Sequence, residues 1–181
     1  MTPSVVFRSR GSVVLAAIVI VLAAVLAVSA LVVGWPPSAA VAFAAVGWGA
    51  WVLYVRPCVI LHEDAVELRN VARDVTIPYG AIDDVDTRFQ LNITAGGRTY
   101  RAWALPAPSG GRAKRLSDVR EGQRPGDSPS TLSGAAALRL RQSVAGAERT
   151  DAPVIQRTSA LVLGGTAAIA VLLLVLSLLG L

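Results

Sequence analysis

Few residues of this chain could perform acid, base or nucleophilic chemistry. Its one histidine, His62, is followed directly by Glu63 and Asp64. Histidine titrates nearest to neutral pH, but a catalytic or metal site needs further convergent groups, and the sequence contains no second histidine. We interpret His62 as a surface residue at a turn. The sequence therefore predicts a protein that is not an enzyme, with no catalytic residue and no bound cofactor.

Three acidic residues, Asp83, Asp84 and Asp86, could offer oxygen ligands to a divalent cation. They lack the glycine-spaced loop and the bidentate glutamate of a calcium site, so a solvated acidic face is the simpler interpretation. The single cysteine, Cys58, excludes an intramolecular disulfide and a cysteine-rich metal site. We predict no metal site.

The positive charge of the chain is spread along it. The whole sequence carries +5, and residues 56–157 hold 15 basic and 12 acidic residues, a net charge of +3. Nucleic-acid binding requires a clustered basic surface, so we predict no nucleic-acid partner. Only one basic residue, Lys114, is a lysine, a bias typical of a GC-rich genome.

Three apolar stretches without any charge bracket the polar middle of the chain. A bilayer core takes roughly 20 helical residues to cross, which predicts transmembrane helices at 13–33, 37–55 and 159–180. The first could instead be a signal peptide, because Arg8 and Arg10 precede it, but the uninterrupted apolar run to Val33 favours a retained helix. The second is rich in alanine and glycine, so we expect it to pack closely against the first.

The charges that flank these stretches predict an orientation in the membrane. Arg8 and Arg10 precede the first helix, whereas the 34–38 turn after it has no charge. The positive-inside rule then places the N-terminus and the middle region in the cytoplasm and Leu181 outside. We expect a multi-pass protein of the plasma membrane. The absence of charge within the helices argues against a transporter or channel.

The middle region reads as short β-strands. Alternating apolar and polar residues predict antiparallel strands with one buried face, at 59–62, 65–70, 75–78, 88–94 and 98–105, with 81–85 as a turn or a further strand. Turns are expected at 63–64 and 95–97. The bulky residues at alternating positions predict a core made of Val66, Leu68, Ile77, Leu91, Ile93 and Trp103.

The same region carries a resemblance to a known family. Its pattern consists of Glu-Asp-Ala-Val-Glu-Leu-Arg-Asn at 63–70, Val-Thr-Ile-Pro-Tyr at 75–79 and Ala-Ile-Asp-Asp-Val at 81–85. It resembles the bacterial PH-like domains of membrane proteins, in particular the low-molecular-weight protein antigen 6 type, which is actinobacterial in character. The resemblance covers 56–105 and implies a small antiparallel β-sheet, partly barrel-like, with a C-terminal helix and no catalytic residues.

Together these features predict an α+β membrane protein. We expect an N-terminal transmembrane helical hairpin, a PH-like β domain at 56–105, and a third transmembrane helix. Between them, the composition of 106–133 predicts a disordered linker, and an amphipathic helix follows at 134–150. Its apolar stripe consists of Ala137, Leu140, Val144 and Ala147. This helix could dock on the sheet or lie on the membrane.

Two functions are compatible with this organisation. The first is protein interaction or assembly in the cell envelope, with the bilayer as one partner and another membrane or envelope protein as the other. The second is peripheral sensing of anionic lipid by the amphipathic helix and the basic linker. The linker residues that could contact lipid are Arg112, Lys114, Arg115, Arg120 and Arg124.

Overall fold

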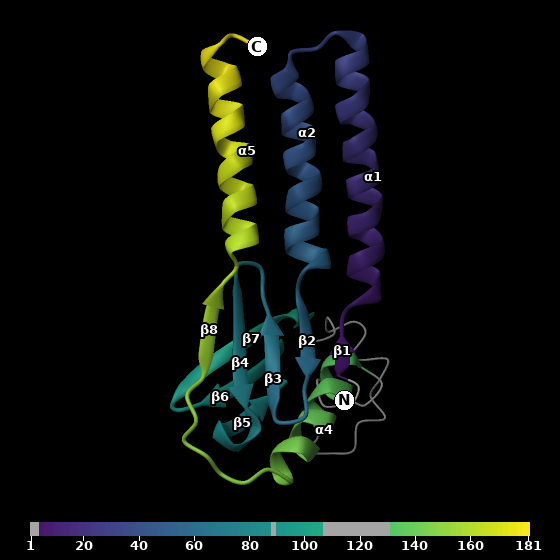
Figure 1. Cartoon of the computed structure of the whole chain (residues 1–181). Coiled ribbons are helices and arrows are strands. Elements are labelled where there is room, and N and C mark those ends of the chain that lie inside the picture. Colours follow the sequence, from purple (N-terminus) through teal and green to yellow (C-terminus); the bar gives the residue numbers. More distant parts are fainter. Residues whose placement is uncertain (1–3, 88–89, 107–130) are drawn as a thin grey trace. The chain divides into compact units, whose positions relative to one another are not determined.

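The computed structural model describes residues 4–87, 90–106 and 131–181 (Figure 1). The chain divides into two compact units. The β domain consists of Met1–Ser9 and Pro57–Arg157, and the helical unit consists of Arg10–Arg56 and Thr158–Leu181. Each unit is assembled from segments that are distant in sequence.

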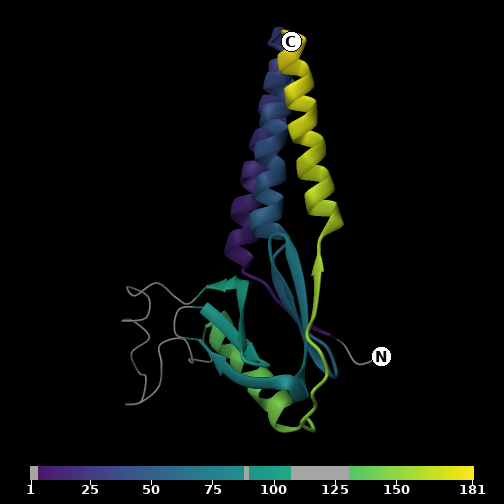
Figure 2. The ribbon, with the colours of Figure 1, turned by 90° about the vertical axis from the view of Figure 1, so that its left-hand side faces the viewer.

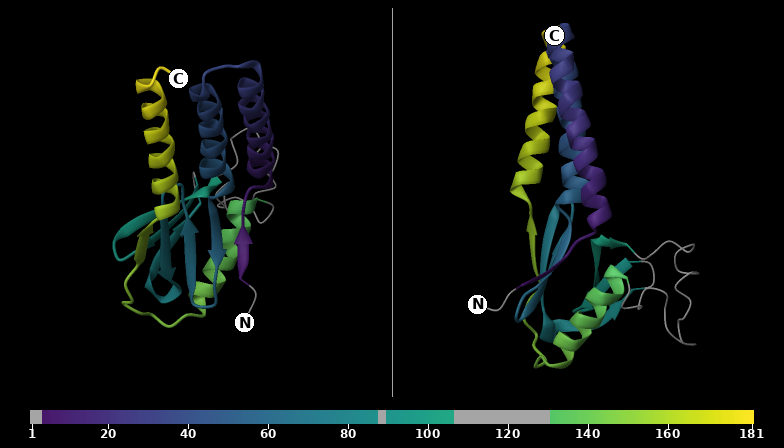
Figure 3. Two further views of the ribbon diagram at one scale, coloured as in Figure 1. Left: turned by 45° about the horizontal axis from the view of Figure 1, so that its top comes forward. Right: turned by 90° about the vertical axis from the view of Figure 1, so that its right-hand side faces the viewer.

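The helical unit contains the three apolar helices that the sequence predicts. They are α1 (Arg10–Val33), α2 (Pro37–Ala50), which continues into the π-helical turn η1 (Trp51–Val55), and α5 (Ala160–Leu178). All three are long and apolar enough to cross a membrane. Gly34, with φ of +81°, and Pro37 at the start of α2 make the tight turn between α1 and α2 (Figure 3).

Small residues allow these helices to approach closely. The buried residues of α1 are Ala16, Ala23 and Ala30, spaced seven apart on one face. A Cβ on Gly47 of α2 would lie 3.5 Å from the Ala23 Cβ, so the two backbones are nearly in contact there. The expected packing of the second apolar helix on the first is confirmed.

A tryptophan of α2 fixes the contact with α5. Gly165 lies against the Trp48 ring with no room for a Cβ. The Trp48 Nε1 donates a hydrogen bond of 3.2 Å to Thr166 Oγ1, and the ring stacks on Trp51 at 5.2 Å.

The β domain consists of two antiparallel sheets and one helix. The larger sheet has the order β1-β2-β3-β4-β8 and the smaller sheet the order β5-β6-β7. The strands of the larger sheet are β1 (Val5–Phe7), β2 (Cys58–Leu61), β3 (Ala65–Arg69), β4 (Arg73–Pro78) and β8 (Ile155–Thr158). Those of the smaller sheet are β5 (Ile82–Asp86), β6 (Gln90–Ala95) and β7 (Arg98–Pro106). The 3₁₀ turn η2 (Tyr79–Ala81) joins the two sheets.

The helix α4 (Leu132–Ala145) closes the core over the smaller sheet (Figure 2). Its residues Ala136, Ala137 and Leu140 are buried in the same cluster as the inner faces of both sheets, and Val144 and Ala147 pack at its margin. Thr131 caps the helix by accepting a hydrogen bond of 3.0 Å from the Gly134 amide. The apolar stripe therefore docks on the sheet.

Most of the predicted core is confirmed. Val66, Leu68, Ile77, Leu91 and Ile93 are all fully buried. Their strands begin and end within two residues of the expected positions. The hairpin turn at Gly96 and Gly97 has φ of +55° and +72°, the conformation that favours glycine.

Several expectations are wrong. Trp103 is 58% exposed, because its neighbours Ala102 and Ala104 occupy the inner face of β7. The strands β1 and β8 were not predicted. The helix begins at Leu132 and ends at Ala145, not at 134 and 150, and Pro106 still belongs to β7. The rest of the predicted linker, 107–130, lies outside the described residues.

Candidate functional site

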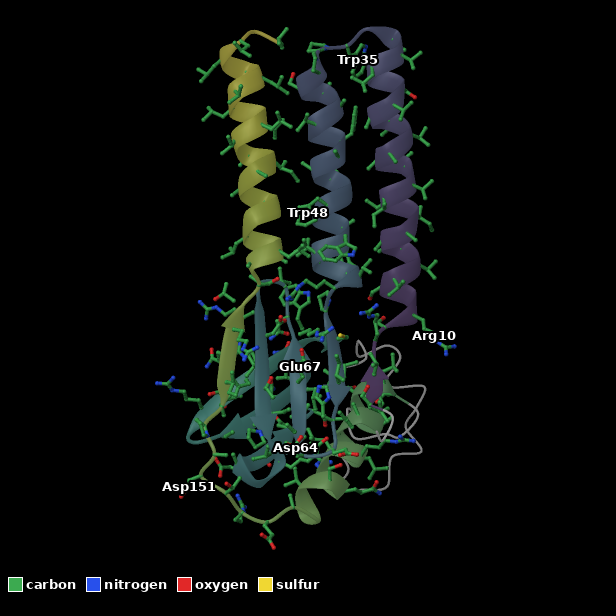
Figure 4. All side chains as sticks on the ribbon, viewed as in Figure 1. Arg10, Trp35, Trp48, Asp64, Glu67 and Asp151 are labelled. Carbon is green, nitrogen blue, oxygen red and sulfur yellow. The ribbon has the colours of Figure 1, made fainter. Side chains whose placement is uncertain are left out.

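His62 belongs to a small charged network on the exposed face of β3. Its Nε2 lies 3.0 Å from Glu67 Oε2, and Arg69 Nε donates a hydrogen bond of 2.7 Å to Glu67 Oε1 (Figure 4 labels Glu67). Partial burial raises the pKa of Glu67, but the hydrogen bonds and charges of Arg69 and His62 outweigh it and hold that pKa below its usual value. A carboxylate with both oxygens engaged is poorly placed to act as a general base. The network holds the side chains of His62, Glu67 and Arg69 in place on the outer face of the sheet.

Tyr79, the aromatic residue of the Ile-Pro-Tyr step, holds the β2–β3 turn. Its hydroxyl donates a hydrogen bond of 2.7 Å to the His62 carbonyl, and its amide donates one of 2.9 Å to the Asp64 carbonyl. Burial raises the pKa of Tyr79, and the Asp64 carboxylate adds to this effect against a hydrogen bond with Ser143. A buried, neutral phenol in this position serves the fold.

The acidic residues and the cysteine that could bind a metal ion or react do not form a site in the described residues. Asp83 lies 3.6 Å from the Arg149 guanidinium. Among the described residues, no three His, Cys, Asp or Glu side chains are grouped so as to hold a metal ion. Cys58 is buried in β2, with 2% of its surface exposed.

The lipid-sensing alternative depends on five linker residues and on the amphipathic helix. Arg112, Lys114, Arg115, Arg120 and Arg124 lie outside the described residues. The apolar stripe that would insert into a membrane, centred on Ala137 and Leu140, is buried in the β domain. A helix whose apolar face is already covered has little area left for a bilayer.

The outer strands of the smaller sheet are blocked by side chains. Arg141 Nη2 donates a hydrogen bond of 2.8 Å to the Val85 carbonyl of β5, and Arg149 Nη1 donates one of 3.1 Å to the Ile82 carbonyl. Arg141 lies in α4 and Arg149 lies four residues after its end. Both side chains occupy main-chain acceptors that an added strand would need.

Asn70 performs the same task for β7. Its Nδ2 donates a hydrogen bond of 2.9 Å to the Arg101 carbonyl, and its Oδ1 accepts one of 2.9 Å from the Trp103 amide. The side-chain amide thus imitates a short piece of strand and ties the end of β3 to the smaller sheet. This gives a physical reason for an asparagine at the end of the Arg-Asn pattern.

The outer strands of the larger sheet differ from these. β1 has three residues, of which Val5 and Phe7 pack against the core. All four residues of β8 are exposed. Sequence reasoning missed β8 because Ile155-Gln156-Arg157-Thr158 lacks apolar alternation; only the short extended stretch after Pro153 could have indicated it.

Comparison with known proteins adds no relative. No family model, curated protein or solved structure matches this chain.

Proposed function

We propose that this chain is a non-enzymatic integral membrane protein whose PH-like β domain, on the cytoplasmic side, binds an extended segment of another membrane or envelope protein. The observation that carries the proposal is the outer strand β8, whose four residues are all exposed. An exposed edge strand offers a row of main-chain donors and acceptors, and extended peptides bind such edges by adding a strand.

The contrast between the sheet edges supports a role for β8. Side chains of Arg141, Arg149 and Asn70 occupy main-chain groups of β5 and β7. Such blocking is the usual protection against unwanted pairing. We assign functional meaning to β8 because the same domain protects its smaller sheet in this way.

The residues of β8 define the chemistry of the partner. Its one charge is Arg157, and Ile155 is 48% exposed. The main-chain ladder supplies affinity in strand addition, and alternate side chains supply specificity. A segment with an apolar residue to meet Ile155 and an acidic residue to meet Arg157 fits this edge best.

The connection of β8 to α5 favours a partner in the same membrane. Only Ser159 separates β8 from an apolar helix that could cross a bilayer. Two proteins anchored in one membrane meet at a high effective concentration, so a short edge of four residues can suffice where it would bind weakly in solution.

Site-specific photo-crosslinking in living cells tests this proposal. A benzoylphenylalanine at Ile155 should form an adduct with a second polypeptide, and one at the exposed Leu138 of α4 should not. Because successive N–H groups of a strand point to opposite sides, one of Gln156→Pro and Arg157→Pro removes only an outward donor. We expect that variant to keep its melting temperature and lose the adduct.

The opposite result is equally clear. Strand addition at β8 is wrong if every proline variant that remains folded still gives the Ile155 adduct. It is also wrong if the adduct contains only this chain or only lipid.

A further inference from the structure

A second feature of the β domain shares one residue, Gln156, with β8 but does not use the main-chain edge of that strand. A cavity of about 540 Å³ opens beside the starts of β4 and β7. Its lining includes three arginines, Arg73, Arg98 and Arg101, together with the polar side chains of Tyr100 and Gln156. The three arginines come from two different sheets, so only the folded domain assembles them.

The charge in this cavity is uncompensated. Of the residues that the structure describes, no aspartate or glutamate lines it. Among the described residues, Arg69 is paired with Glu67 and Arg149 with Asp83, but Arg73, Arg98 and Arg101 have no ion-pair partner there. Three guanidinium groups around one concave surface repel one another unless an anion lies between them.

Two other cavities in the described part of the domain lack this character. One of about 530 Å³ shares Arg98 but also contains Asp83 and Asp151. Another, of about 600 Å³, is lined by both Arg139 and Glu63. Carboxylates in both reduce the attraction for an anion, so the three-arginine cavity stands apart.

From this arrangement we infer that the cavity of Arg73, Arg98 and Arg101 binds a multiply charged anion of the phosphate class. The guanidinium group presents a planar fork of donors that matches phosphate oxygens in pairs, and it stays protonated throughout the physiological range. A phosphate ester or diphosphate carries enough charge to neutralise three arginines, which a single carboxylate does not. The phosphate can belong to a soluble molecule or to an anionic lipid headgroup.

Titration of the detergent-solubilised full chain with inorganic pyrophosphate, at an ionic strength held constant with NaCl, tests the inference. We expect wild-type protein to bind and its melting temperature to rise. Each of Arg73→Gln, Arg98→Gln and Arg101→Gln should weaken the affinity about tenfold or more, since a hydrogen bond to a charged group contributes at least a tenfold factor. The triple variant should show no binding.

Arg139→Gln is the matched control. It removes the same charge from an exposed arginine on α4, outside this cavity, and should bind pyrophosphate as wild type does. Melting temperatures without ligand report whether each variant is folded.

A lipid source is separated from a soluble one in nanodiscs. If a headgroup occupies the cavity, exchange of phosphatidylcholine for phosphatidylglycerol raises the melting temperature of wild type but not of the triple variant. If the ligand is soluble, pyrophosphate raises the wild-type melting temperature in phosphatidylcholine, and the lipid exchange affects wild type and triple variant equally. The inference is wrong if neither anion distinguishes wild type from the triple variant, or if Arg139→Gln lowers the affinity as much as the cavity variants do.

Discussion

At the scale of single residues, the polar side chains of the β domain mostly serve its architecture. Asn70 bridges the two sheets, and Tyr79 ties the β2–β3 turn to the core. The sequence indicated that positions 70 and 79 matter, because they carry the family-like pattern. It could not indicate why, since the Arg101 and Trp103 main-chain groups that the Asn70 side chain contacts lie more than 30 positions along the chain.

The corrected position of Trp103 leads to a stability prediction. Leu68→Ala and Ile93→Ala each remove a fully buried side chain and should lower the free energy of unfolding by about 2 to 5 kcal/mol. Trp103→Ala removes an exposed ring and should change it by about 0.5 kcal/mol or less. Urea unfolding of the detergent-solubilised chain, followed by circular dichroism, measures all three. A Trp103→Ala loss as large as that of Leu68→Ala would mean that β7 is in the wrong register.

The Glu67 network predicts a pH dependence. The pKa of Glu67 in the folded domain lies below its ordinary value of 4.5, so the ionised carboxylate contributes stability above that pH. This contribution is lost as the pH falls from 4.5 through the lower folded-state pKa. Glu67→Gln should lower stability at pH 7 and flatten its decline in acid, whereas Glu63→Gln should leave stability at pH 7 unchanged. Unfolding curves between pH 3 and pH 7 would contradict the account if the slope in acid were the same for wild type and Glu67→Gln.

At the scale of elements, sequence patterns identified what is local and amphipathic. The strands β3, β4, β6 and β7 and the stripe of α4 follow from alternation and from helical spacing, because one face of each is buried. The sequence also predicts β2, which is buried at all four positions, but it allows either a turn or a strand at 81–85, where β5 lies. The sequence does not predict β1 and β8, because a short or exposed outer strand has no such pattern. These segments are strands because they pair with the edges of β2 and β4. The size of Trp103 wrongly indicates burial, because Ala102 and Ala104 occupy the inner face of β7 and Trp103 lies on the other face.

A glycine in η2 provides a test of how the elements pack. A Cβ on Gly80 would collide with the Glu148 carbonyl, and the Gly80 carbonyl accepts a hydrogen bond of 3.1 Å from the Thr150 amide. Gly80→Ala should therefore push the segment that leads to β8 away and cost about 1 to 3 kcal/mol. Gly146→Ala is the control, since its Cβ would have only ordinary contacts, the nearest at 3.8 Å. Equal unfolding midpoints for the two variants would show that this close approach does not exist.

At the scale of the whole molecule, the chain passes three times between its two units. Two residues join β1 to α1, two join η1 to β2, and one joins β8 to α5. The β domain therefore includes an N-terminal strand that precedes the first apolar helix. A soluble fragment of 56–157 would lack β1 and expose the edge of β2, so the intact chain is the proper object for every experiment above.

We propose that the chain spans the membrane three times and presents its β domain to the cytoplasm. Labelling of single introduced cysteines by a membrane-impermeant maleimide tests it most directly, because the native Cys58 is 2% exposed and contributes little background. The chosen sites are two exposed turn positions, Pro36→Cys between α1 and α2 and Glu63→Cys between β2 and β3.

We expect Pro36→Cys to be labelled in intact cells and Glu63→Cys only after the membrane has been opened. Labelling of Glu63→Cys in intact cells, with Pro36→Cys protected until the membrane is opened, would invert the orientation. Labelling of both in intact cells would contradict the membrane-spanning hairpin itself.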